Sequence, residues 1–550
     1  MRTIERRIGL LFAGFLLCFL VVTVRAVWLQ GVQGARLASE AAYQQTEQIE
    51  VPGLRGSLLD RYGNPLAVSE DAATIYATPY QVKKPAQAAE QLARILDLDE
   101  ADVLHSLTED SGFSYVAQKV DLPTAARVSR LELPGIGQLP DSRRTYPQGE
   151  LAAQTLGAVG AENEGLTGLE GGEESILGGT DGERRIVKDA LGETIRMETV
   201  TDASDGEDIR LTLDPAIQKS AEQALAEVGE TYAPKGATAI VMDPRDSDVL
   251  AMANWPPFDP TDLADADEED LLNRATGFNY EPGSTFKAFT VAAALEEKLV
   301  TPGSTFTLAP TIQVADRTIE ESHARGWATM SVAEILAHSS NVGAVTIGLQ
   351  LGSERFSRWI HRFGFGRPTG VRFPAEEVGI VPELEDYSGS TMGNLPLGQG
   401  LSVTPMQMMS GYAAIANGGV LRSPQLVEEV DGERIPTPRG HRVIQPGVAA
   451  EVRTMLEGVL APGGTASEVS VPGYTLAGKT GTAEVAENGT YSETKYVASF
   501  IGFAPAQDPQ LLVAVIVDQP QGDIYGGSVA APAFGEIAEF ALPYLGVPPE

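Results

Sequence analysis

Residues 281–287 read Glu281-Pro282-Gly283-Ser284-Thr285-Phe286-Lys287, and an alanine-rich apolar run follows them as far as Leu295. Proline and glycine ahead of an apolar run are typical of a helix start, so Ser284 is predicted at a helix N-terminus. Lys287 lies three residues further on, which places both side chains on one helix face. A serine hydroxyl needs a base, and a desolvated lysine beside the positive end of a helix can act as one. The segment therefore predicts a nucleophilic serine with a lysine base.

Two further motifs follow along the chain. Ser339-Ser340-Asn341 closes a helical pattern at residues 332–338, and Lys479-Thr480-Gly481-Thr482 follows an apolar run at 474–478 that reads as a strand. Taken alone, Ser339 and Asn341 are typical of a helix C-terminus. Ser-x-x-Lys, Ser-x-Asn and Lys-Thr-Gly in this order form one signature of serine acyl-enzymes, which favours functional roles for all three motifs.

The Ser-x-x-Lys spacing is weak evidence by itself, because the chain contains a second match at Ser492 and Lys495. That match is interpreted as a solvated loop ahead of a strand. A near copy of the first segment stands at residues 302–307, but Thr307 replaces the lysine there. No base is available in the near copy, so it is interpreted as structural.

The order of the remaining patterns predicts an α+β fold. A helical pattern at residues 214–228 begins after a cap-like aspartate, and two apolar runs at 237–242 and 249–253 read as a hairpin. Strand patterns return at 496–503 and 511–517 after a mostly helical middle. Strands at both ends with helices between them predict one shared antiparallel sheet flanked by helices.

Composition excludes several classes of protein. A chain of 550 residues is expected to form two to four domains. Its 75 acidic against 40 basic residues argue against a nucleic-acid partner. Cys18 is the one cysteine, which rules out a disulfide framework. The five histidines lack His-Glu-x-x-His spacing, so neither a metal nor another cofactor is expected.

The N-terminus predicts a membrane anchor. Three arginines precede an uncharged stretch at residues 8–24, and residues 26–29 extend the apolar run past Arg25. A single span needs about 20 apolar residues, and the arginine cluster favours a cytoplasmic N-terminus. No small-residue cleavage site follows directly, which favours an uncleaved anchor over a signal peptide. Residues 1–7 are therefore predicted as cytoplasmic and 8–28 as transmembrane, and an Ala- and Gln-rich helical stalk is expected at 29–50.

Roughly residues 205–545 resemble the transpeptidase domain of class B penicillin-binding proteins, the septal, cell-division branch most closely. The context of Ser340 and Asn341 carries the likeness to that branch. Segments before this domain resemble the same family, namely 55–63, 144–147, 165–170 and 181–182, as do 398–405, 525–527 and 531–532 within it. The resemblance implies a single transmembrane helix, an elongated mixed α/β pedestal or dimerisation domain at 29–204, and a β-lactamase-like transpeptidase domain at 205–550.

The resemblance also implies a role for each motif residue. Ser284 would attack the carbonyl of the penultimate D-alanine of a stem peptide, and Lys287 would take its proton. Ser339, held by Lys479, would pass that proton to the departing D-alanine. Further implied roles are an amide contact for Asn341, carboxylate binding for Thr480 and Thr482 on either side of Gly481, and an oxyanion hole from the N–H groups of Ser284 and Thr482.

The implied partners are peptidoglycan stem peptides, β-lactams that acylate Ser284, and divisome membrane proteins. No segment before residue 205 resembles a glycosyltransferase, so the resemblance implies a separate SEDS-family glycosyltransferase. The implied location is the plasma membrane, with a single pass and the catalytic domain outside the cell.

Several alternatives stay open at this stage. A class A β-lactamase carries Glu-x-x-Leu-Asn after its Ser-x-Asn motif, but here that box, residues 269–273, precedes Ser284. An elongation- or sporulation-type transpeptidase and a D,D-carboxypeptidase are closer alternatives. A β-lactam sensor or divisome scaffold is the non-enzymatic alternative; sensors usually carry cytoplasmic machinery, and intact catalytic motifs are not needed by a scaffold.

Overall fold

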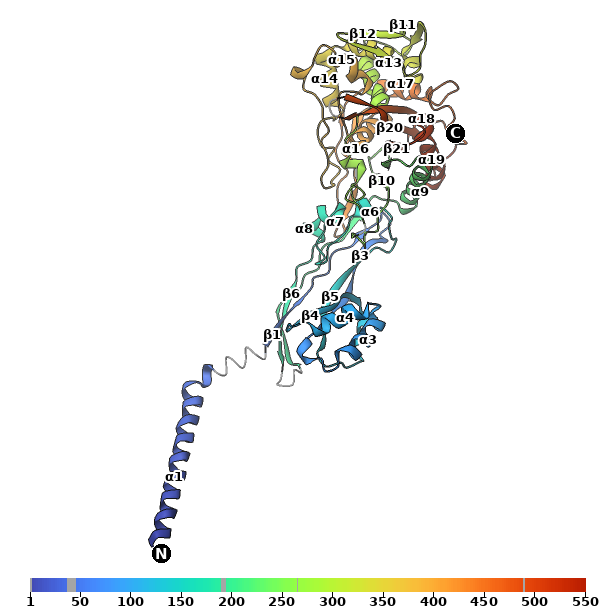
Figure 1. Cartoon of the computed structure of the whole chain (residues 1–550). Helices are drawn as coiled ribbons and strands as arrows, with labels where there is room; N and C mark the ends of the chain where they lie inside the picture. Colours follow the sequence, from blue (N-terminus) through green and yellow to red (C-terminus); the bar gives the residue numbers. More distant parts are fainter. Residues whose placement is uncertain (1, 37–45, 189–193, 265, 488–489) are drawn as a thin grey trace. The chain divides into compact units, whose positions relative to one another are not determined.

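The computed structural model describes residues 2–36, 46–188, 194–264, 266–487 and 490–550. Contacts between residues divide the chain into two compact units (Figure 1). The first unit contains Met1–Leu54, Asp71–Arg143 and Gly179–Gly206, and the second contains Arg55–Glu70, Arg144–Gly178 and Glu207–Glu550. Both units are therefore assembled from segments that are distant in sequence.

The first unit begins with helix α1 (Arg2–Val27), which a short π-helix, η1 (Trp28–Val32), continues. Within the described ranges, residues Ile4–Val32 form the one helix long and apolar enough to cross a membrane. Large apolar side chains such as Phe15, 79% exposed, face outward along it. Such a surface is unfavourable in water and suited to hydrocarbon, in agreement with the predicted anchor segment.

The expected helical stalk at 29–50 is confirmed at 29–32 and 34–36, which are helical, and is wrong at 46–50, which form a strand; residues 37–45 lie outside the described part. Strand β1 (Thr46–Val51) pairs antiparallel with β6 (Gly182–Lys188), and β6 pairs with β7 (Thr194–Thr201). The ladder satisfies the backbone groups of β1 through a segment more than a hundred residues away. Long-range pairing of this kind overrides local helix propensity.

The rest of the first unit is a small α/β layer. The second half of strand β3 (Pro65–Ala77) pairs with β4 (Ser114–Asp121), and β3 also pairs with β5 (Ile136–Thr145). Three helices cover these strands: α3 (Pro85–Leu96), α4 (Glu100–Thr108) and α5 (Leu122–Ser129). Their apolar faces meet around Ile75, Leu92 and Leu107.

A five-stranded antiparallel sheet forms the centre of the second unit, in the order β10-β9-β21-β20-β19. The strands are β9 (Gly236–Met242), β10 (Val249–Trp255), β19 (Ala477–Glu487), β20 (Thr490–Ala504) and β21 (Leu511–Asp518). The two ends of this part of the chain therefore share one sheet, which confirms the sequence prediction. β19 is an edge strand of that sheet.

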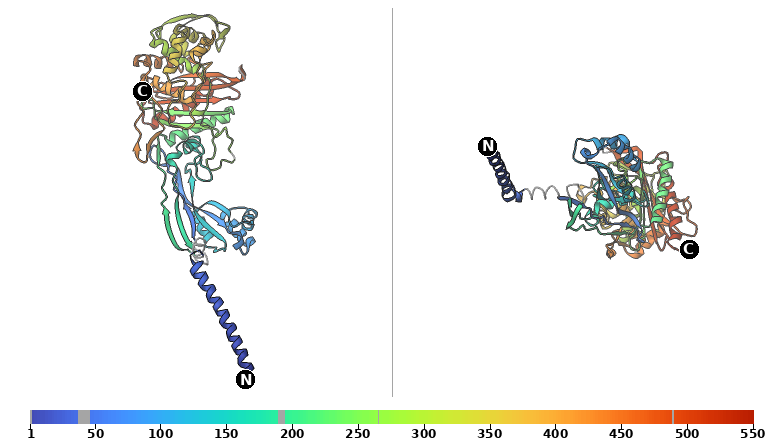
Figure 2. Two further views of the ribbon diagram at one scale, coloured as in Figure 1. Left: turned by 90° about the vertical axis from the view of Figure 1, so that its left-hand side faces the viewer. Right: turned by 90° about the horizontal axis from the view of Figure 1, so that it is seen from below.

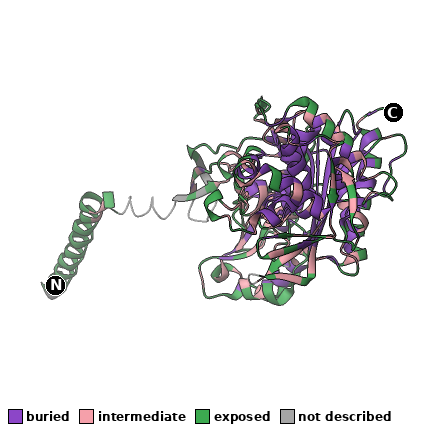
Figure 3. Cartoon of the chain, turned by 90° about the horizontal axis from the view of Figure 1, so that it is seen from above, coloured by how far each residue is buried: buried purple, intermediate pink, exposed green. Residues whose placement is uncertain are grey.

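Helices cover both faces of the sheet (Figures 1 and 2). Side chains alternate across a strand, so Val513 and Val515 pack under helices α9 (Pro215–Tyr232) and α19 (Ala531–Tyr544). Leu512 and Ala514 pack on the opposite face, against the helices α11 (Lys287–Glu296), α12 (Val332–Ala337), α13 (Asn341–Leu351), α16 (Pro405–Ala416) and α17 (Pro446–Glu457). Figure 3 shows buried residues gathered in the interior among strands and helices, whereas the helix at the N-terminus is exposed. The arrangement confirms the predicted sheet flanked by helices.

A buried ion triad joins the segments of the second unit that are distant in sequence. The Glu170 carboxylate accepts from Arg55 Nε at 2.5 Å and from Arg144 Nε at 2.7 Å, and the exposed fraction of each of the three side chains is 3% or less. Both guanidinium groups lie in motifs that carry the family resemblance. Removing one member would leave a buried charge without its partner, which typically costs about 3–5 kcal/mol.

Shorter elements complete the second unit. They are β2 (Leu58–Leu59), α6 (Ala153–Leu156), α7 (Gly168–Gly172), α8 (Glu174–Leu177), β8 (Ile209–Leu211), α10 (Arg274–Gly277), η3 (Gly283–Phe286), β11 (Thr305–Leu308), β12 (Thr311–Val314), β13 (Arg317–Glu320), β14 (Ala328–Ser331), α14 (Ser353–Arg362), η4 (Leu384–Asp386), α15 (Thr391–Asn394), η5 (Leu395–Leu397), β15 (Val420–Leu421), β16 (Val427–Val430), β17 (Glu433–Arg434), β18 (His441–Arg442) and α18 (Gly526–Val529).

Candidate active site

Ser284 lies on the 3-10 turn η3, which leads directly into helix α11, so the predicted helix start is confirmed. The turn requires Gly283, whose φ is +54°. The Gly283 N–H donates to the carbonyl of Gly398 at 3.0 Å. A Cβ added to Gly398 would lie 2.2 Å from the Gly283 oxygen, so only glycine permits this approach. The loop at 398–405 thus packs closely against the serine turn and is hydrogen-bonded to it through Gly398.

Lys287 is buried, with 1% of its surface exposed. Its Nζ donates to the Ser339 carbonyl at 2.7 Å, to Ser339 Oγ at 3.3 Å and to Asn341 Oδ1 at 2.6 Å. Burial lowers the pKa of Lys287 to about 7, and the nearby Glu321 carboxylate opposes that effect. A large fraction of this lysine is therefore neutral near neutral pH, as a general base must be.

The junction between helices α12 and α13 presents Ser339 to that lysine. Ser339 has a φ of +57°, a left-handed conformation that costs a side-chain-bearing residue about 1–2 kcal/mol. Ser340 then caps α13, since its Oγ accepts from Gly343 N at 3.0 Å. The strained turn directs both the carbonyl and the hydroxyl of Ser339 at Lys287 Nζ.

The side-chain amide of Asn341 is held at both ends. Its Oδ1 accepts from Lys287, and its Nδ2 donates to the Glu320 carbonyl at 2.8 Å. An amide nitrogen carries two hydrogens, so one donor is left over. Asn341 also lines the pocket described below, where that donor is available to a ligand.

The Lys-Thr-Gly-Thr motif lies on the edge strand β19. Lys479 is fully buried, and its Nζ donates to the Thr480 carbonyl at 3.1 Å. Burial and then the nearby Lys287 ammonium lower the pKa of Lys479. A Cβ on Gly481 would lie 2.3 Å from Ser499 Oγ and 3.1 Å from the Pro282 carbonyl, so glycine lets the strand lie against the serine turn.

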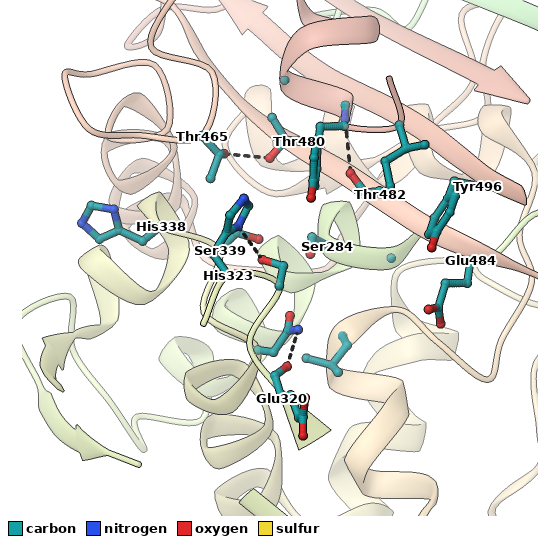
Figure 4. A pocket seen from close by; sticks show the side chains of 18 of the residues that line it. Ser284, Glu320, His323, His338, Ser339, Thr465, Thr480, Thr482, Glu484 and Tyr496 are labelled. Carbon is teal, nitrogen blue, oxygen red and sulfur yellow. Dashed lines mark hydrogen bonds between the residues drawn. The ribbon is translucent and has the colours of Figure 1, made fainter. Parts of the chain in front are cut away.

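An open pocket of about 860 Å³ unites these elements. Ser284, Ser339, Asn341, Thr480 and Thr482 all line it, as Figure 4 shows for the labelled side chains. The other three residues that the sequence singled out, Lys287, Lys479 and Gly481, lie beside these five, so all eight converge from η3, α11, the α12–α13 junction and β19. Within the described ranges no hydrogen bond links Ser284 Oγ to Lys287, or Lys479 to Ser339, so the hydroxyl of Ser284 is free toward the pocket.

Sequence reasoning missed several residues around this pocket. Thr465 shares a 2.7 Å hydrogen bond with Thr480, and the rings of His323 and Tyr525 lie 5.5 Å apart at their centroids. Glu321 receives hydrogen bonds from the Ser340–Asn341 turn. Tyr525 belongs to the segment 525–527 that resembles the family, although no role was predicted for it. Thr465, His323 and Glu321 lie in irregular segments without periodicity or motif, so no sequence signal marked them.

The expected loop around the second Ser-x-x-Lys match is wrong, because Ser492 and Lys495 lie within strand β20. Pairing with β19 extends the strand beyond the predicted start at residue 496. The Lys495 side chain is 43% exposed and forms an ion pair with Glu487 at 2.5 Å. This second match therefore contains no buried lysine that could act as a base.

Comparison with known families settles the class of the chain. Residues 237–539 match the family profile described as "Penicillin binding protein transpeptidase domain", and residues 50–211 match "Penicillin-binding Protein dimerisation domain". The chain belongs to the class B penicillin-binding proteins. The serine turn, the α12–α13 junction and β19 all lie within the part matched by the transpeptidase profile.

Characterised relatives of this penicillin-binding protein extend over nearly its whole length. It is 35% identical to stage V sporulation protein D of Bacillus subtilis, over 100% of this chain and 87% of that protein. It is 31% identical to the peptidoglycan D,D-transpeptidase FtsI of Escherichia coli, over 100% of this chain and 93% of that one. The relatives thus include both a sporulation protein and FtsI.

Solved structures agree with this class. Penicillin-binding protein 3 of Mycobacterium tuberculosis, complexed with aztreonam, has a TM-score of 0.72 and 30% identity, covering 91% of this chain and 98% of that one. Penicillin-binding protein 2X of Streptococcus thermophilus has a TM-score of 0.78 and 26% identity, covering 90% and 80%. The apolar α1 helix fits a membrane-anchored member of this family.

Proposed function

We propose that this penicillin-binding protein is a peptidoglycan D,D-transpeptidase that cross-links stem peptides through an acyl-enzyme on Ser284. The observation that carries the proposal is the buried amine of Lys287, which binds Ser339 and Asn341, two residues that line the same pocket as Ser284. Family membership and relatives named peptidoglycan D,D-transpeptidase support the reaction class.

In the proposed acylation, Ser284 Oγ attacks the carbonyl carbon of the penultimate D-alanine while Lys287 accepts the hydroxyl proton. The tetrahedral oxyanion would accept hydrogen bonds from the backbone N–H groups of Ser284 and Thr482. As the C–N bond breaks, Ser339, which Lys479 would hold, passes the proton from Lys287 to the nitrogen of the leaving D-alanine. The amine of a second stem peptide then attacks the ester and regenerates the Ser284 hydroxyl.

The remaining motif residues would bind the donor peptide. Thr480 and Thr482 alternate onto the pocket side of β19, where their hydroxyls suit the terminal carboxylate of a D-Ala-D-Ala end. That anion would also be attracted by Lys479, which lies beneath Thr480. The spare N–H of Asn341 would bind a donor amide. β-Lactams, which carry a carboxylate and a strained amide, would acylate the same serine.

The proposed placement in the cell follows from the anchor and the substrate. Residues 1–7 would be cytoplasmic, 8–28 would span the plasma membrane, 29–204 would form the pedestal or dimerisation domain, and 205–550 would form the extracytoplasmic catalytic domain. Positive charge before the apolar helix supports this orientation. A SEDS-family glycosyltransferase and divisome membrane proteins are the proposed partners. Septal wall synthesis is the proposed role, with elongation or sporulation as alternatives.

The reaction is tested by incubating the purified full-length protein with polymerised peptidoglycan carrying pentapeptide stems, then analysing muropeptides by mass spectrometry. Cross-linked dimers with release of D-alanine are expected, and both should disappear in Ser284→Ala. Release of D-alanine without dimers would identify a D,D-carboxypeptidase instead. Rapid hydrolysis of nitrocefin would identify a β-lactamase.

The cellular role is tested by localising a fluorescent fusion and depleting the protein. Septal use predicts a band at midcell and filamentous cells after depletion. Round cells would indicate elongation, and a defect confined to sporulation would indicate the role named for the Bacillus subtilis relative.

A further inference from the structure

Glu321 is a buried carboxylate beneath the active-site pocket, and none of the three sequence motifs includes it. Its side chain is 7% exposed and lies on the segment that follows strand β13. Oε1 accepts from Ser340 Oγ at 2.6 Å, and Oε2 accepts from the backbone N–H of Asn341 at 2.6 Å. Both contacts are made to the turn that presents Ser339 to Lys287.

The contacts of Glu321 have two consequences. First, the carboxylate binds the first backbone N–H of helix α13, where a negative charge is stabilising, and so fixes the start of that helix. Second, Asn341 separates Glu321 from the catalytic lysine, because its N–H binds the carboxylate and its Oδ1 binds Lys287 Nζ. The Glu321 carboxylate is therefore connected to the Lys287 amine through one intervening residue, Asn341. That amine must be unprotonated to act as the base.

Few other charges act on that amine. The charged and titratable groups that line the pocket are Arg317, Glu320, His323, His338, Glu468, Glu484, Tyr496 and Tyr525, and Glu321, Arg325 and Lys479 lie beside these residues. Glu321 is the carboxylate that raises the pKa of Lys287 against the effect of burial. Arg325 neutralises part of that charge through a 2.5 Å contact from Nη2 to Oε1.

We propose, building on the function proposed above, that Glu321 is a positioning residue that fixes the Ser339–Asn341 turn against Lys287 and sets the pH range in which Ser284 is acylated. The ion pair with Arg325 tunes this effect. With both partners present, the carboxylate attracts the Lys287 ammonium only in part. Removing the Glu321 carboxylate lowers the pH at which Lys287 loses its proton. Removing the Arg325 guanidinium raises that pH.

The test is the pH dependence of acylation of the full-length protein in detergent by a fluorescent penicillin, from pH 5 to 9. Glu321→Gln removes the charge but can keep an oxygen on Asn341 N and an NH₂ donor on Ser340 Oγ. Lys287 then loses its proton at lower pH, so the rising limb of the rate profile moves down by about 1 pH unit. Arg325→Gln frees the carboxylate, and the limb moves to higher pH.

Glu320→Gln is the matched control. Its side chain is the neighbouring carboxylate, but it is exposed and makes no hydrogen bond or ion pair within the described ranges, so solvent screens it. The limb should stay in place in this variant. Glu321→Asp keeps the charge but shortens the side chain, so it should lower the rate at every pH while the limb moves less than in Glu321→Gln.

The outcomes separate this inference from the proposed function. Wild-type protein without covalent labelling, or labelling that persists in Ser284→Ala, would contradict the proposed function itself. Normal wild-type labelling with the same limb in Glu321→Gln and Arg325→Gln would overturn the role of Glu321 alone. Thermal unfolding reports whether each variant is folded, and Arg325→Gln still decides the question if Glu321→Gln does not fold.

Discussion

Two segments of this chain carry a serine and a lysine at the same spacing, and the structure gives them opposite properties. Ser284 and Lys287 lie where a 3-10 turn enters a helix, and the lysine is 1% exposed among oxygen acceptors. Ser492 and Lys495 lie on strand β20, and this lysine is 43% exposed in an ion pair with Glu487. The backbone N–H of Lys495 donates to Ser492 Oγ at 3.2 Å, so this hydroxyl takes part in a local hydrogen bond within strand β20.

The difference shows that spacing alone does not create a nucleophile and its base. Burial without a direct counter-ion lowers the pKa of Lys287 to about 7, which makes the amine a base at neutral pH. Lys495 is exposed to solvent and pairs with the Glu487 carboxylate. Of the residues from Ser492 to Tyr496, Tyr496 alone lines the pocket. The sequence motif provides the serine and the lysine, and burial in the folded protein makes the lysine a base.

The largest effect is expected from replacing each of the two serines, one at a time, by alanine. Ser284→Ala should abolish covalent labelling by fluorescent penicillin, a loss of at least about a thousandfold, because it removes the hydroxyl that forms the ester. Ser492→Ala should label like the wild type. In-gel fluorescence of the full-length protein measures both, and labelling retained in Ser284→Ala would assign the nucleophile elsewhere.

The two lysines should differ almost as strongly. Lys287→Met removes the base and should slow acylation by about 10²–10⁴-fold, whereas Lys495→Met should leave the rate unchanged. The base must be neutral to accept a proton, so the wild-type rate should rise with pH through about 7, the pKa of Lys287. Stopped-flow acylation rates across pH measure this limb. A wild-type rate that falls across the same range would contradict Lys287 as the base.

A smaller effect should separate the serine turn from its near copy at residues 302–307. Gly283 has a φ of +54°, and an added Cβ would lie 3.2 Å from the Ala483 Cβ, whereas nothing lies within 4 Å of a Cβ at Gly303. Gly283→Ala should cost about 1–2 kcal/mol of unfolding free energy and slow acylation. Gly303→Ala should change the unfolding free energy by less than about 0.5 kcal/mol. Denaturant titration measures both, and equal values would remove the special status of the serine turn.

The smallest effect is expected at the ion pair between Lys495 and Glu487. Both side chains are more than 40% exposed, so water and salt screen their attraction. A double-mutant cycle with Lys495→Ala and Glu487→Ala should give a coupling energy below about 1 kcal/mol. Added salt should reduce it further. A larger, salt-independent coupling would mean that this segment is more ordered than its exposure indicates.

Much of the catalytic unit could be predicted from local pattern. Continuous apolar runs marked the strands at 237–242, 249–253 and 511–517, and the structure pairs them in one sheet. Asp214 ahead of a proline marked the start of helix α9, whose N-terminal N–H groups the Asp214 carboxylate accepts. The three motifs could be located because each has a fixed spacing within a few residues.

Other features had no local signal. The strand β1 pairs with β6 across more than a hundred residues, and such a partner is invisible to a window of sequence. Glu321 and Thr465 reach the site from irregular loops, where neither period nor cap identifies a position. The left-handed conformation of Ser339 also follows from packing around it, because serine has no intrinsic preference for positive φ.

The sequence by itself determined the family, the order of the three motifs and the residue types available for catalysis, since these depend on spacing along the chain. The tertiary structure alone decided which Ser-x-x-Lys pair has a buried amine and which carboxylate lies beside it. Protonation depends on desolvation and on charges a few ångströms away, and those are set by segments that meet only in the folded protein.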